Sequence, residues 1–463
     1  MSYVYLNHLT IETTSPLAIG TGEREIGFDN QLIRDVNKLP YIPSTSIAGV
    51  WRSLANLRLG NDITDKWFGH LETKSKLTIS QGYLLDTHQN VVKGLLSKER
   101  IQADPLLTYL QQSNPMHRER VRLNDRGVAT EKGKFDQILL PSGLRFNVTL
   151  QWQGESESEL DQFKELLALW QDNQLAFGSN TTNGLGQTKL ISQSASLISL
   201  CDDPSAGKAL RTARTNYANR NEIIATPEQP FATLALKGTG TWRSGQGNQH
   251  LSKQGLDADA DVITYSEAKV EWLNNKATLS VHAPLITGST VKGIIAHRFS
   301  YHLRRLNKQW AETQYSSGKD EWVLRPAEAD DLFGYANEKS GEGKSGRLIF
   351  HDAHITNFVP VVRYHNAIDR FTGGVIQGAL YSEELLEHPE FTIQISAKSG
   401  TTITPIQHHA LLATFEDIEM GLLPIGGGSG RGHSLTEKHG VWEINWDQIT
   451  ISEAQEEVVG ANK

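Results

Sequence analysis

The chain has 463 residues, 38% hydrophobic and 21% charged. This globular composition excludes a disordered protein, and the length predicts two or three domains. The net charge of −8 argues against a uniformly basic nucleic-acid binder, although segments 118–134 and 298–308 are locally rich in Lys and Arg. The single cysteine, Cys201, excludes a disulfide framework and a Cys-based zinc site. Because we find no signal peptide and no apolar run near about 20 residues, we expect a soluble cytoplasmic protein with no membrane partner.

The first half predicts alternating strands and helices in chain order. Residues 6–13 alternate like a strand. Hydroxyls at 44–46 are candidate N-caps for a helix that ends at Gly60. Strands are predicted over 76–85, 145–152 and 188–192, with a second helix over 160–170. The two helical stripes are Ile47, Val50, Trp51, Leu54 and Leu57, and then Leu160, Phe163, Leu166, Leu167 and Trp170.

The second half repeats this order, over 232–239, 289–305, 347–355, 392–398, 408–420 and a strand from about His433. Motifs recur with it: 44–49 resembles 288–293, and Asp125-Arg126-Gly127 resembles 369–373, both 244 positions later. Phe68-Gly69 recurs as Phe333-Gly334, and 184–186 recurs as 430–432. We therefore predict an α+β protein of two tandem ferredoxin-like (RRM-like, β-α-β-β-α-β) domains, 1–192 and 231–463, joined by a linker over 193–230.

Each predicted second helix leads into a glycine-rich loop, 177–186 and 426–432. Such loops turn backbone N–H groups toward a phosphate and let a ribose approach closely. One loop alone is more often a plain turn, but two at matched places favour binding. The candidate RNA-binding residues are Gly178, Ser179, Asn180, Gly184 and Gly186 in the first loop, and Gly427, Gly428, Ser429 and Arg431 in the second.

The N-termini of the two predicted first helices are further candidates for phosphate binding, because they present unpaired N–H groups and a positive dipole end. The first carries Ser44, Thr45 and Ser46, and the second Ser289 and Thr290. Lys292 lies in the first turn of the second helix. In the first helix Ala48 replaces it, and Arg52 is the nearest cation. Plain N-capping explains the hydroxyls equally well.

The segment His351-Asp352-Ala353-His354 suggests a metal cluster at first sight. Along a strand, however, side chains alternate between faces, so His351 and His354 would point to opposite sides. A strand with some polar positions is the favoured interpretation. The sequence contains neither a phosphate-binding P-loop motif nor a dinucleotide fingerprint.

Several segments resemble the RAMP superfamily, and most closely the backbone subunits of type III CRISPR effector complexes. They are 39–49 (LPYIPSTSIAG), 284–293 (PLITGSTVKG), 332–334 (LFG) with 346–353 (GRLIFHDA), and 368–373 (IDRFTG). The resemblance covers nearly the whole chain, once per half, as in the fused two-in-one subunits of type III-D complexes.

The resemblance implies a subunit that stacks with other effector subunits around a guide RNA (crRNA) paired with a target RNA. A β-hairpin "thumb" from each domain would wedge between paired bases. The thumbs would be about 118–137 and 363–379, and they carry Arg126 and Arg370. Recognition would be independent of sequence, because base pairing supplies the specificity.

The resemblance also implies cleavage of the target RNA by an aspartate in the loop between the first strand and the first helix, with a divalent metal, Mg²⁺, as cofactor. In this sequence Asp29 is the match and the expected metal ligand, and Asp35 is the alternative. The second half has a longer loop with Asp257, Asp259 and Asp261, of which Asp259 is the first choice. A solvated loop acid is the competing interpretation of each.

Two rival functions share this resemblance. One is a non-catalytic RNA-binding scaffold of the same complex. The other is a guide-processing endoribonuclease, which would use a histidine and typically has one C-terminal glycine-rich loop. The glycine-rich loop in each half argues against the second rival.

Overall fold

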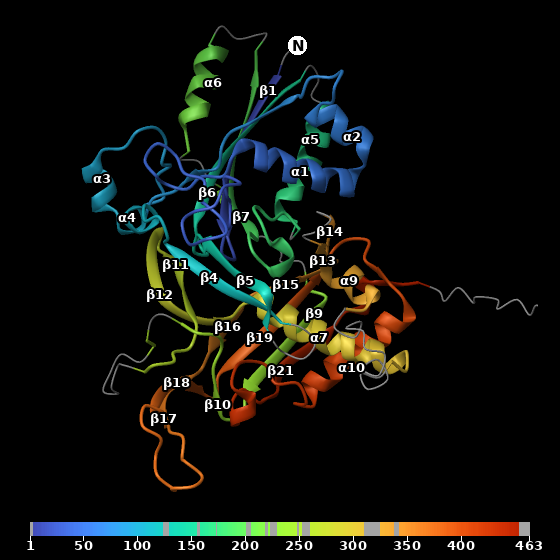
Figure 1. Ribbon diagram of the computed structural model, residues 1–463. Coiled ribbons are helices and arrows are strands. Elements are labelled where there is room, and N and C mark those ends of the chain that lie inside the picture. The colour runs from blue at the N-terminus through green and yellow to red at the C-terminus, as the bar shows by residue number, and fades with distance from the viewer. Residues whose placement is uncertain are drawn as a thin grey trace, which may run out of the picture.

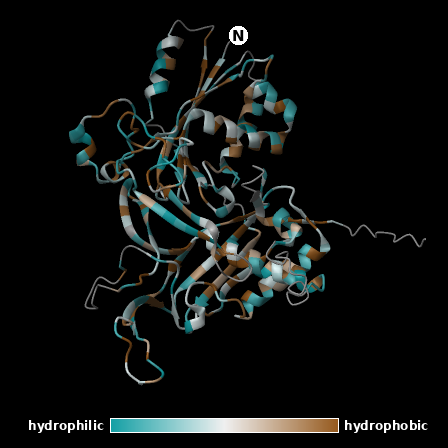
Figure 2. Cartoon of the chain, viewed as in Figure 1, coloured by the Kyte–Doolittle hydropathy of each residue, from teal (hydrophilic) through white to brown (hydrophobic). Residues whose placement is uncertain are grey.

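The protein is a mixed α+β molecule in which each half contains its own antiparallel sheet and its own hydrophobic core (Figure 1). The computed structural model describes residues 3–123, 129–154, 158–172, 174–200, 205–217, 221–222, 229–247, 250–251, 260–309, 325–337 and 342–452. Hydrophobic and hydrophilic residues are interspersed along its helices and strands (Figure 2). None of the described helices combines the length and the apolar composition needed to cross a membrane.

The sheet of the first half has the strand order β2-β6-β1-β7-β8, and β3 also pairs with β6. Helices pack on it through a core that includes the buried rings of Trp51, Phe163 and Trp170. The strands are β1 (Tyr3–Thr13), β2 (Leu77–Ile79), β3 (Tyr83–Leu84), β6 (Arg145–Gly154), β7 (Thr188–Ser199) and β8 (Asn221–Glu222), and the helices are α1 (Ser44–Leu59), α2 (Asn61–Phe68) and α5 (Ser158–Ala168).

The sheet of the second half has the order β11-β12-β16-β19-β9-β21, and β15 also pairs with β19. Its core joins Leu234 and Ile393 of the sheet to Phe299 and Phe415 of the helices. The strands are β9 (Ala232–Gly238), β11 (Ser266–Leu273), β12 (Lys276–Ile286), β15 (Leu348–Phe350), β16 (Ala353–Thr356), β19 (Glu390–Ala397) and β21 (Thr436–Ile444), and the helices are α7 (Gly288–Leu306), α9 (Ala327–Phe333) and α10 (Pro405–Glu419).

A β-hairpin lies at each place where the sequence predicts a thumb. The first is β4 (Met116–Leu123) with β5 (Ala129–Leu139), and the second is β17 (Val359–His365) with β18 (Tyr381–Glu387). The second hairpin projects from the body of the molecule (Figure 1). At its tip the Asp369 carboxylate accepts hydrogen bonds from the N–H groups of Phe371 and Thr372, and the Phe371 side chain is 100% exposed.

Some predicted boundaries are wrong. The predicted strands 76–85 and 347–355 are each broken into two short strands, β2 with β3 and β15 with β16. In the second break Asp352 leaves the sheet to accept a hydrogen bond from the N–H of Gly288. Strand β7 runs to Ser199, beyond the predicted 192, because it pairs with β1 along its whole length.

The first helix ends at Gly60 as predicted, but its N-cap and its apolar stripe differ from the prediction. Pro43, and none of the hydroxyl residues, occupies the N-cap of α1, and no side chain caps the helix. Leu57 of the predicted apolar stripe is 55% exposed, because the buried face continues instead through Ala55.

Several elements have no counterpart in the predictions, because they are too short for a clear period or fall within expected loops. They are α2, α3 (Lys98–Ala103), α4 (Pro105–Leu110), α6 (Ala206–Thr215), β8, β10 (Thr241–Trp242), the β11–β12 hairpin, α9, β13 (Gly334–Asn337), β14 (Glu342–Ser345), β20 (Thr402–Ile403) and β22 (Thr450–Ile451). Most of the insertion at 307–325 lies outside the described residues.

Candidate nucleic-acid interface

The two glycine-rich loops have the same backbone conformation. Each contains a short 3-10 turn, η2 (Thr181–Asn183) or η4 (Ser429–Arg431), flanked on both sides by left-handed residues. Asn180 (φ 59°) and Gly184 (φ 81°) flank the first turn, and Gly428 (φ 78°) and Gly432 (φ 81°) flank the second. Gly184 therefore matches Gly432, and the sequence alignment of 184–186 with 430–432 was wrong by two positions.

The misalignment has a physical cause. The position of Gly186 (φ 71°) is taken in the second loop by Ser434, a non-glycine residue that also has a positive φ of 61°. Matching glycine to glycine therefore selects the wrong register. Strands β7 and β21, which begin at Thr188 and Thr436, follow the corrected register.

The two loops differ in exposure. In the second loop Ser429 and Arg431 are exposed. In the first loop Ser179 is exposed, but Gly184 is buried against the second half, where a Cβ atom on it would lie 2.3 Å from the carbonyl oxygen of Phe350. In the first loop Ser179 thus faces solvent, and Gly184 packs against the second half.

The first thumb hairpin holds the exposed part of the first loop. The side-chain amide of Gln137 donates to the Oγ of Ser179 at 2.8 Å and accepts from the Nδ2 of Asn180 at 3.1 Å. The guanidinium of Arg120 donates to the same Gln137 oxygen at 2.9 Å. Burial lowers the pKa of Arg120, and so does nearby Arg118, while the Asp29 carboxylate raises it.

Lys292 brings a cation from the second half to the first loop. From α7 its Nζ donates to the Oγ1 of Thr182 at 3.4 Å. Burial, together with Arg325, Lys398 and Arg120, lowers the pKa of Lys292 to about 8. Among the described residues no carboxylate lies within ion-pair distance of it. A half-buried cation among other cations lacks a counter-charge, which an anion such as a phosphate would provide.

The other helix-terminal candidates are engaged within the chain or exposed. Arg52 forms an exposed ion pair with Asp65 at 2.8 Å. The hydroxyls of Ser289 and Thr290 lie 3.0 and 2.9 Å from the Oγ1 of Thr287, the residue that caps α7. Helix capping within the chain thus accounts for the hydroxyls of Ser289 and Thr290. In the first set Ser44 and Ser46 are half-buried and Thr45 is exposed.

Asp29 and Asp261 make the same contact in the two halves. Oδ2 of Asp29 accepts the backbone N–H of Asp136 on β5 at 3.0 Å, and Oδ2 of Asp261 accepts that of Ser382 on β18 at 2.7 Å. Both carboxylates are exposed at the base of a thumb strand. The hydrogen bonds from Ser382 lower the pKa of Asp261.

The chain on each side supports this equivalence. Four residues after Asp29, the N–H of Ile33 bonds to the carbonyl of Ile19. Four residues after Asp261, the N–H of Tyr265 likewise bonds to the carbonyl of Ser244. In the described part of the chain Asp261 is thus the counterpart of Asp29.

The remaining sequence candidates fall into two groups. Asp35 closes a local turn, in which its Oδ1 accepts from the N–H groups of Asn37 and Leu39, both at 2.8 Å, and its Oδ2 accepts from the Nδ2 of Asn37 at 2.9 Å. Both oxygens are therefore already engaged. Arg370 is exposed near the tip of the second thumb. The sites named for Asp257, Asp259 and Arg126 lie outside the described residues.

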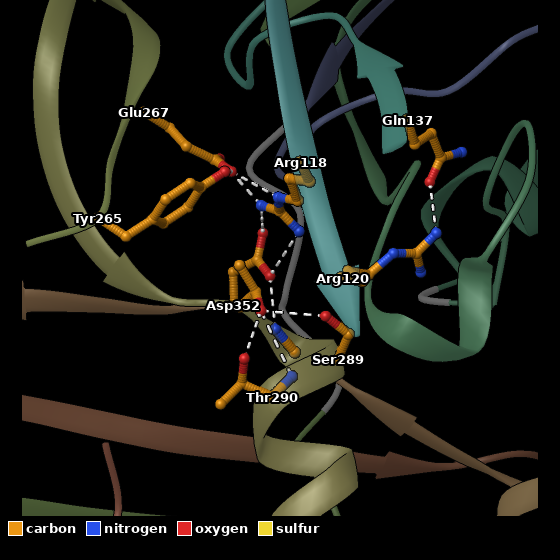
Figure 3. Close-up of polar contacts among 10 residues, drawn as sticks. Arg118, Arg120, Gln137, Tyr265, Glu267, Ser289, Thr290 and Asp352 are labelled. Carbon is orange, nitrogen blue, oxygen red and sulfur yellow. Dashed lines mark hydrogen bonds and ion pairs between the residues drawn. The ribbon is translucent and has the colours of Figure 1, made fainter. Parts of the chain in front are cut away.

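A buried ion cluster beneath the first thumb was not predicted. Arg118 of β4 lies between Glu267 of β11 and Asp352, with its Nη2 2.9 Å from Glu267 Oε2 and its Nη1 3.1 Å from Asp352 Oδ1 (Figure 3). Burial alone would lower the pKa of Arg118, but the Asp352 and Glu267 carboxylates raise it well above its ordinary value. Asp352 belongs to the His351–His354 segment, whose polar character was the available signal.

A cleft of about 510 Å³ opens beside this cluster. Its walls are β4, the segment 244–247, the start of β11 and the N-terminal end of α7. Arg118, Arg120, Thr287 and Thr290 are among its lining residues. The cleft therefore joins the first thumb to the helix that carries Lys292.

The surroundings of Asp29 fit the Mg²⁺ ion that the resemblance implies. With Oδ2 engaged by Asp136, Oδ1 of Asp29 makes no hydrogen bond to the described residues. The neighbouring Asp136 carboxyl has a buried Oδ1 with no hydrogen-bond partner among them. Because Mg²⁺ is usually bound by one or two carboxylates plus substrate phosphates, these groups suit an ion held partly by RNA.

Comparisons with known proteins give a family and a distant structural likeness. The family model of the RAMP superfamily matches residues 10–189 and again 272–435. No curated protein sequence matches the chain. A chain from the solved "Cryo-EM structure of the Type III-B Cmr-beta bound to cognate target RNA" is similar at 16% identity and a TM-score of 0.30, over 42% of this chain and 60% of that one.

Proposed function

Because the chain belongs to the RAMP superfamily, we propose that it is an RNA-binding backbone subunit of a type III CRISPR effector complex. It would hold the guide RNA and cut the paired target RNA. The family model covers both halves, and the described contacts supply groups suited to a polynucleotide.

We further propose that each half is a ferredoxin-like domain. Numbering the strands of each β-α-β-β-α-β unit in chain order, both central sheets read 2-3-1-4: β2-β6-β1-β7 in the first half and β16-β19-β9-β21 in the second. One helix follows the first strand and another follows the third. This shared order supports a duplication of one unit.

RNA binding is supported by exposed polar side chains in the two glycine-rich loops and by one cation of α7. In the glycine-rich loops Ser179 of one half and Arg431 of the other are exposed. Lys292 adds a cation without a carboxylate partner in the described chain. Such groups bind phosphate and ribose without reading the bases.

The equivalent placement of Asp29 and Asp261 carries the cleavage part of the proposal. Each carboxylate is anchored through Oδ2 to a thumb strand, where an inserted wedge would distort the target RNA. A distorted backbone can align a 2′-hydroxyl with its own phosphate, which a regular A-form helix prevents. Asp29 and Asp261 would accept or hold a proton near that hydroxyl. A bound Mg²⁺ would supply charge stabilisation.

The test uses the assembled complex with target RNA labelled at its 5′ end. We expect Asp29→Asn to abolish one set of cuts and Asp261→Asn another, each with a rate loss of at least about 100-fold. Asp161→Asn is the matched control, since that exposed carboxylate only pairs with Lys164. Guide content should be equal in all complexes.

The outcomes separate the rival functions. If both variants cut as the parent does, the subunit is a scaffold without these catalytic residues. Cuts that disappear with Asp259→Asn but persist with Asp261→Asn would refute the structural equivalence. Discrete products from precursor guide RNA with the isolated chain would identify a processing endoribonuclease instead.

A further inference from the structure

A cluster of two histidines and a glutamate lies at the base of the second thumb, and we call it the His-Glu cluster. It consists of His365 at the end of β17, Glu383 on β18 and His433 just after the second glycine-rich loop. The Nε2 atoms of His365 and His433 lie 3.1 and 3.7 Å from Oε2 of Glu383. The side chains of Glu383, His433 and His365 are 0%, 9% and 25% exposed.

The three facing atoms are not satisfied by one another. Nε2 of His365, Nε2 of His433 and Oε2 of Glu383 are all buried and have no hydrogen-bond partner among the described residues. The 3.1 Å between His365 and Glu383 is short enough for a hydrogen bond, but its direction is unsuitable, and the 3.7 Å between His433 and Glu383 is too long for one. Leaving such atoms unpaired is costly, so the convergence of these buried atoms on one point indicates a ligand-binding site.

The groups around the cluster fix the orientation of its members. Nδ1 of His433 lies 2.7 Å from the Oγ1 of Thr241, which leaves Nε2 to face Glu383. The other oxygen of Glu383, Oε1, contacts the guanidinium groups of Arg243 and Arg431. Partners of this kind orient the ligands of metal sites from outside.

We propose that the His-Glu cluster binds a divalent transition metal of the Zn²⁺ class. Two imidazole nitrogens and one carboxylate oxygen are a common protein ligand set for such ions, with one position left open. Metal–ligand bonds of about 2.0–2.2 Å in a tetrahedron separate ligand atoms by roughly 3.3 Å. The observed 3.1 and 3.7 Å bracket this value.

Charge indicates what fills the open position. One carboxylate faces the Arg243 and Arg431 guanidiniums, so a divalent cation leaves an excess of positive charge. An anionic fourth ligand, hydroxide or a phosphate oxygen, would offset it. The partial exposure of His365 and Arg431 gives such a ligand access from solvent.

The matched positions of the first half, all within the described chain, carry no metal ligands. By strand pairing, Arg120 stands in the place of His365, and Gln137 in that of Glu383. The loop register puts Leu185 in the place of His433. In the first half the Arg120 guanidinium donates directly to the Gln137 oxygen. A side-chain cation thus binds the oxygen at the position where, in the second half, the metal would bind Glu383.

Another described group with metal-ligand atoms, Asp86, His88 and Asp104, is different. Asp104 caps helix α4 by accepting from the N–H groups of Leu106 and Leu107, and it also accepts from Thr87. Asp86 accepts from the N–H of Asn90 at 2.8 Å. The carboxylates of this group already accept hydrogen bonds within the chain, so the group serves as the internal control for metal binding.

The experiment measures metal bound to the purified full chain. The protein is stripped with EDTA, incubated with Zn²⁺, Mn²⁺ or Co²⁺, desalted and assayed by inductively coupled plasma mass spectrometry. We expect about one Zn²⁺ per chain, and visible absorption from bound Co²⁺. His365→Gln and His433→Gln should lose the metal, and Thr241→Val should weaken Zn²⁺ affinity by about 10- to 100-fold. His88→Gln should bind as the parent does.

Circular dichroism and thermal unfolding accompany each variant, because the metal should raise the melting temperature of the parent but not that of His365→Gln. The partly exposed His365 is the variant least apt to disturb folding. The proposal is overturned if the folded parent binds no metal, or if the folded His365→Gln and His433→Gln variants retain it. Loss of the metal from His88→Gln alone would place the site elsewhere.

Discussion

Arg118 and Arg363 occupy equivalent positions in the two thumb hairpins but have opposite surroundings. Arg118 pairs in register with Gln137, and Arg363 with Glu383, the matching positions of β5 and β18. The Arg118 side chain is 4% exposed and contacts two buried carboxylates of the second half. Arg363 is 55% exposed and contacts Glu387 at 3.0 Å. One arginine joins the halves, and the other remains at the surface.

The Arg118→Ala substitution should therefore be much more costly than Arg363→Ala. Removing Arg118 leaves Glu267 and Asp352 buried without their cation, which typically costs about 3–5 kcal/mol. Removing Arg363 breaks an exposed pair worth about 0–1 kcal/mol. Urea unfolding of both variants measures the difference. Equal losses would mean that the buried cluster does not stabilise the junction.

The Gly184→Ala substitution should destabilise the protein by more than about 1 kcal/mol. Gly184 has a φ of 81°, and its Cβ would lie 2.3 Å from the carbonyl oxygen of Phe350 in the other half. Gly430→Ala is a control in the second loop, since nothing lies within 4 Å of its added Cβ. Thermal unfolding of both variants tests this. A Gly430 variant as unstable as the Gly184 variant would contradict it.

RNA affinity should fall as the pH rises above about 8, the value to which burial and neighbouring cations lower the pKa of Lys292. A phosphate beside the ammonium favours its protonated form, so binding takes up a proton above that pH. Affinity would then fall by up to about 10-fold per pH unit.

Fluorescence anisotropy with a short single-stranded RNA, measured from pH 7 to pH 9, gives this dependence. Lys292→Met should bind more weakly at pH 7 and show a flatter profile. Lys438→Met, which removes an exposed lysine paired with Glu419, is the control. An unchanged profile in Lys292→Met would show that another group titrates.

Phe371→Ala should reduce the unstacking of bases in the bound target RNA without changing the stability of the fold. The ring is fully exposed at the tip of the second thumb, so stability should change by less than about 0.5 kcal/mol. Stacking of a base on an aromatic ring is worth about 1–3 kcal/mol, which the variant would lose. A 2-aminopurine probe at each target position reports unstacking in the assembled complex. Phe371→Tyr should retain the signal, and a parent-like signal in Phe371→Ala would exclude the ring as the wedge.

The sequence indicated the repeated elements because their apolar periods are local. Helices α1, α7 and α10 were predicted to within a few residues, since one apolar face follows directly from spacing. The hairpins were placed from the resemblance and not from periodicity. Short helices such as α3 and α4, and the β11–β12 hairpin inside an expected loop, gave too few residues for a period to be recognised.

Candidate residues were harder to predict than elements. Choosing among the acids of the second long loop required knowing that Asp261 lies against Ser382, more than a hundred positions away. Matching the glycine-rich loops required backbone angles, because Ser434 adopts a positive φ without being glycine. The three members of the His-Glu cluster come from separate strands and a loop, so no local motif marks them.

By itself the sequence determined the duplication, the α+β composition and the residue types of the loops, since motifs and periods are properties of neighbouring positions. The tertiary structure decided which described carboxylate makes the same contact as Asp29, which arginine is buried and which histidines face one glutamate. These are contacts between segments distant in the chain. Such contacts depend on how strands pair and halves pack, and spacing along the sequence does not record that.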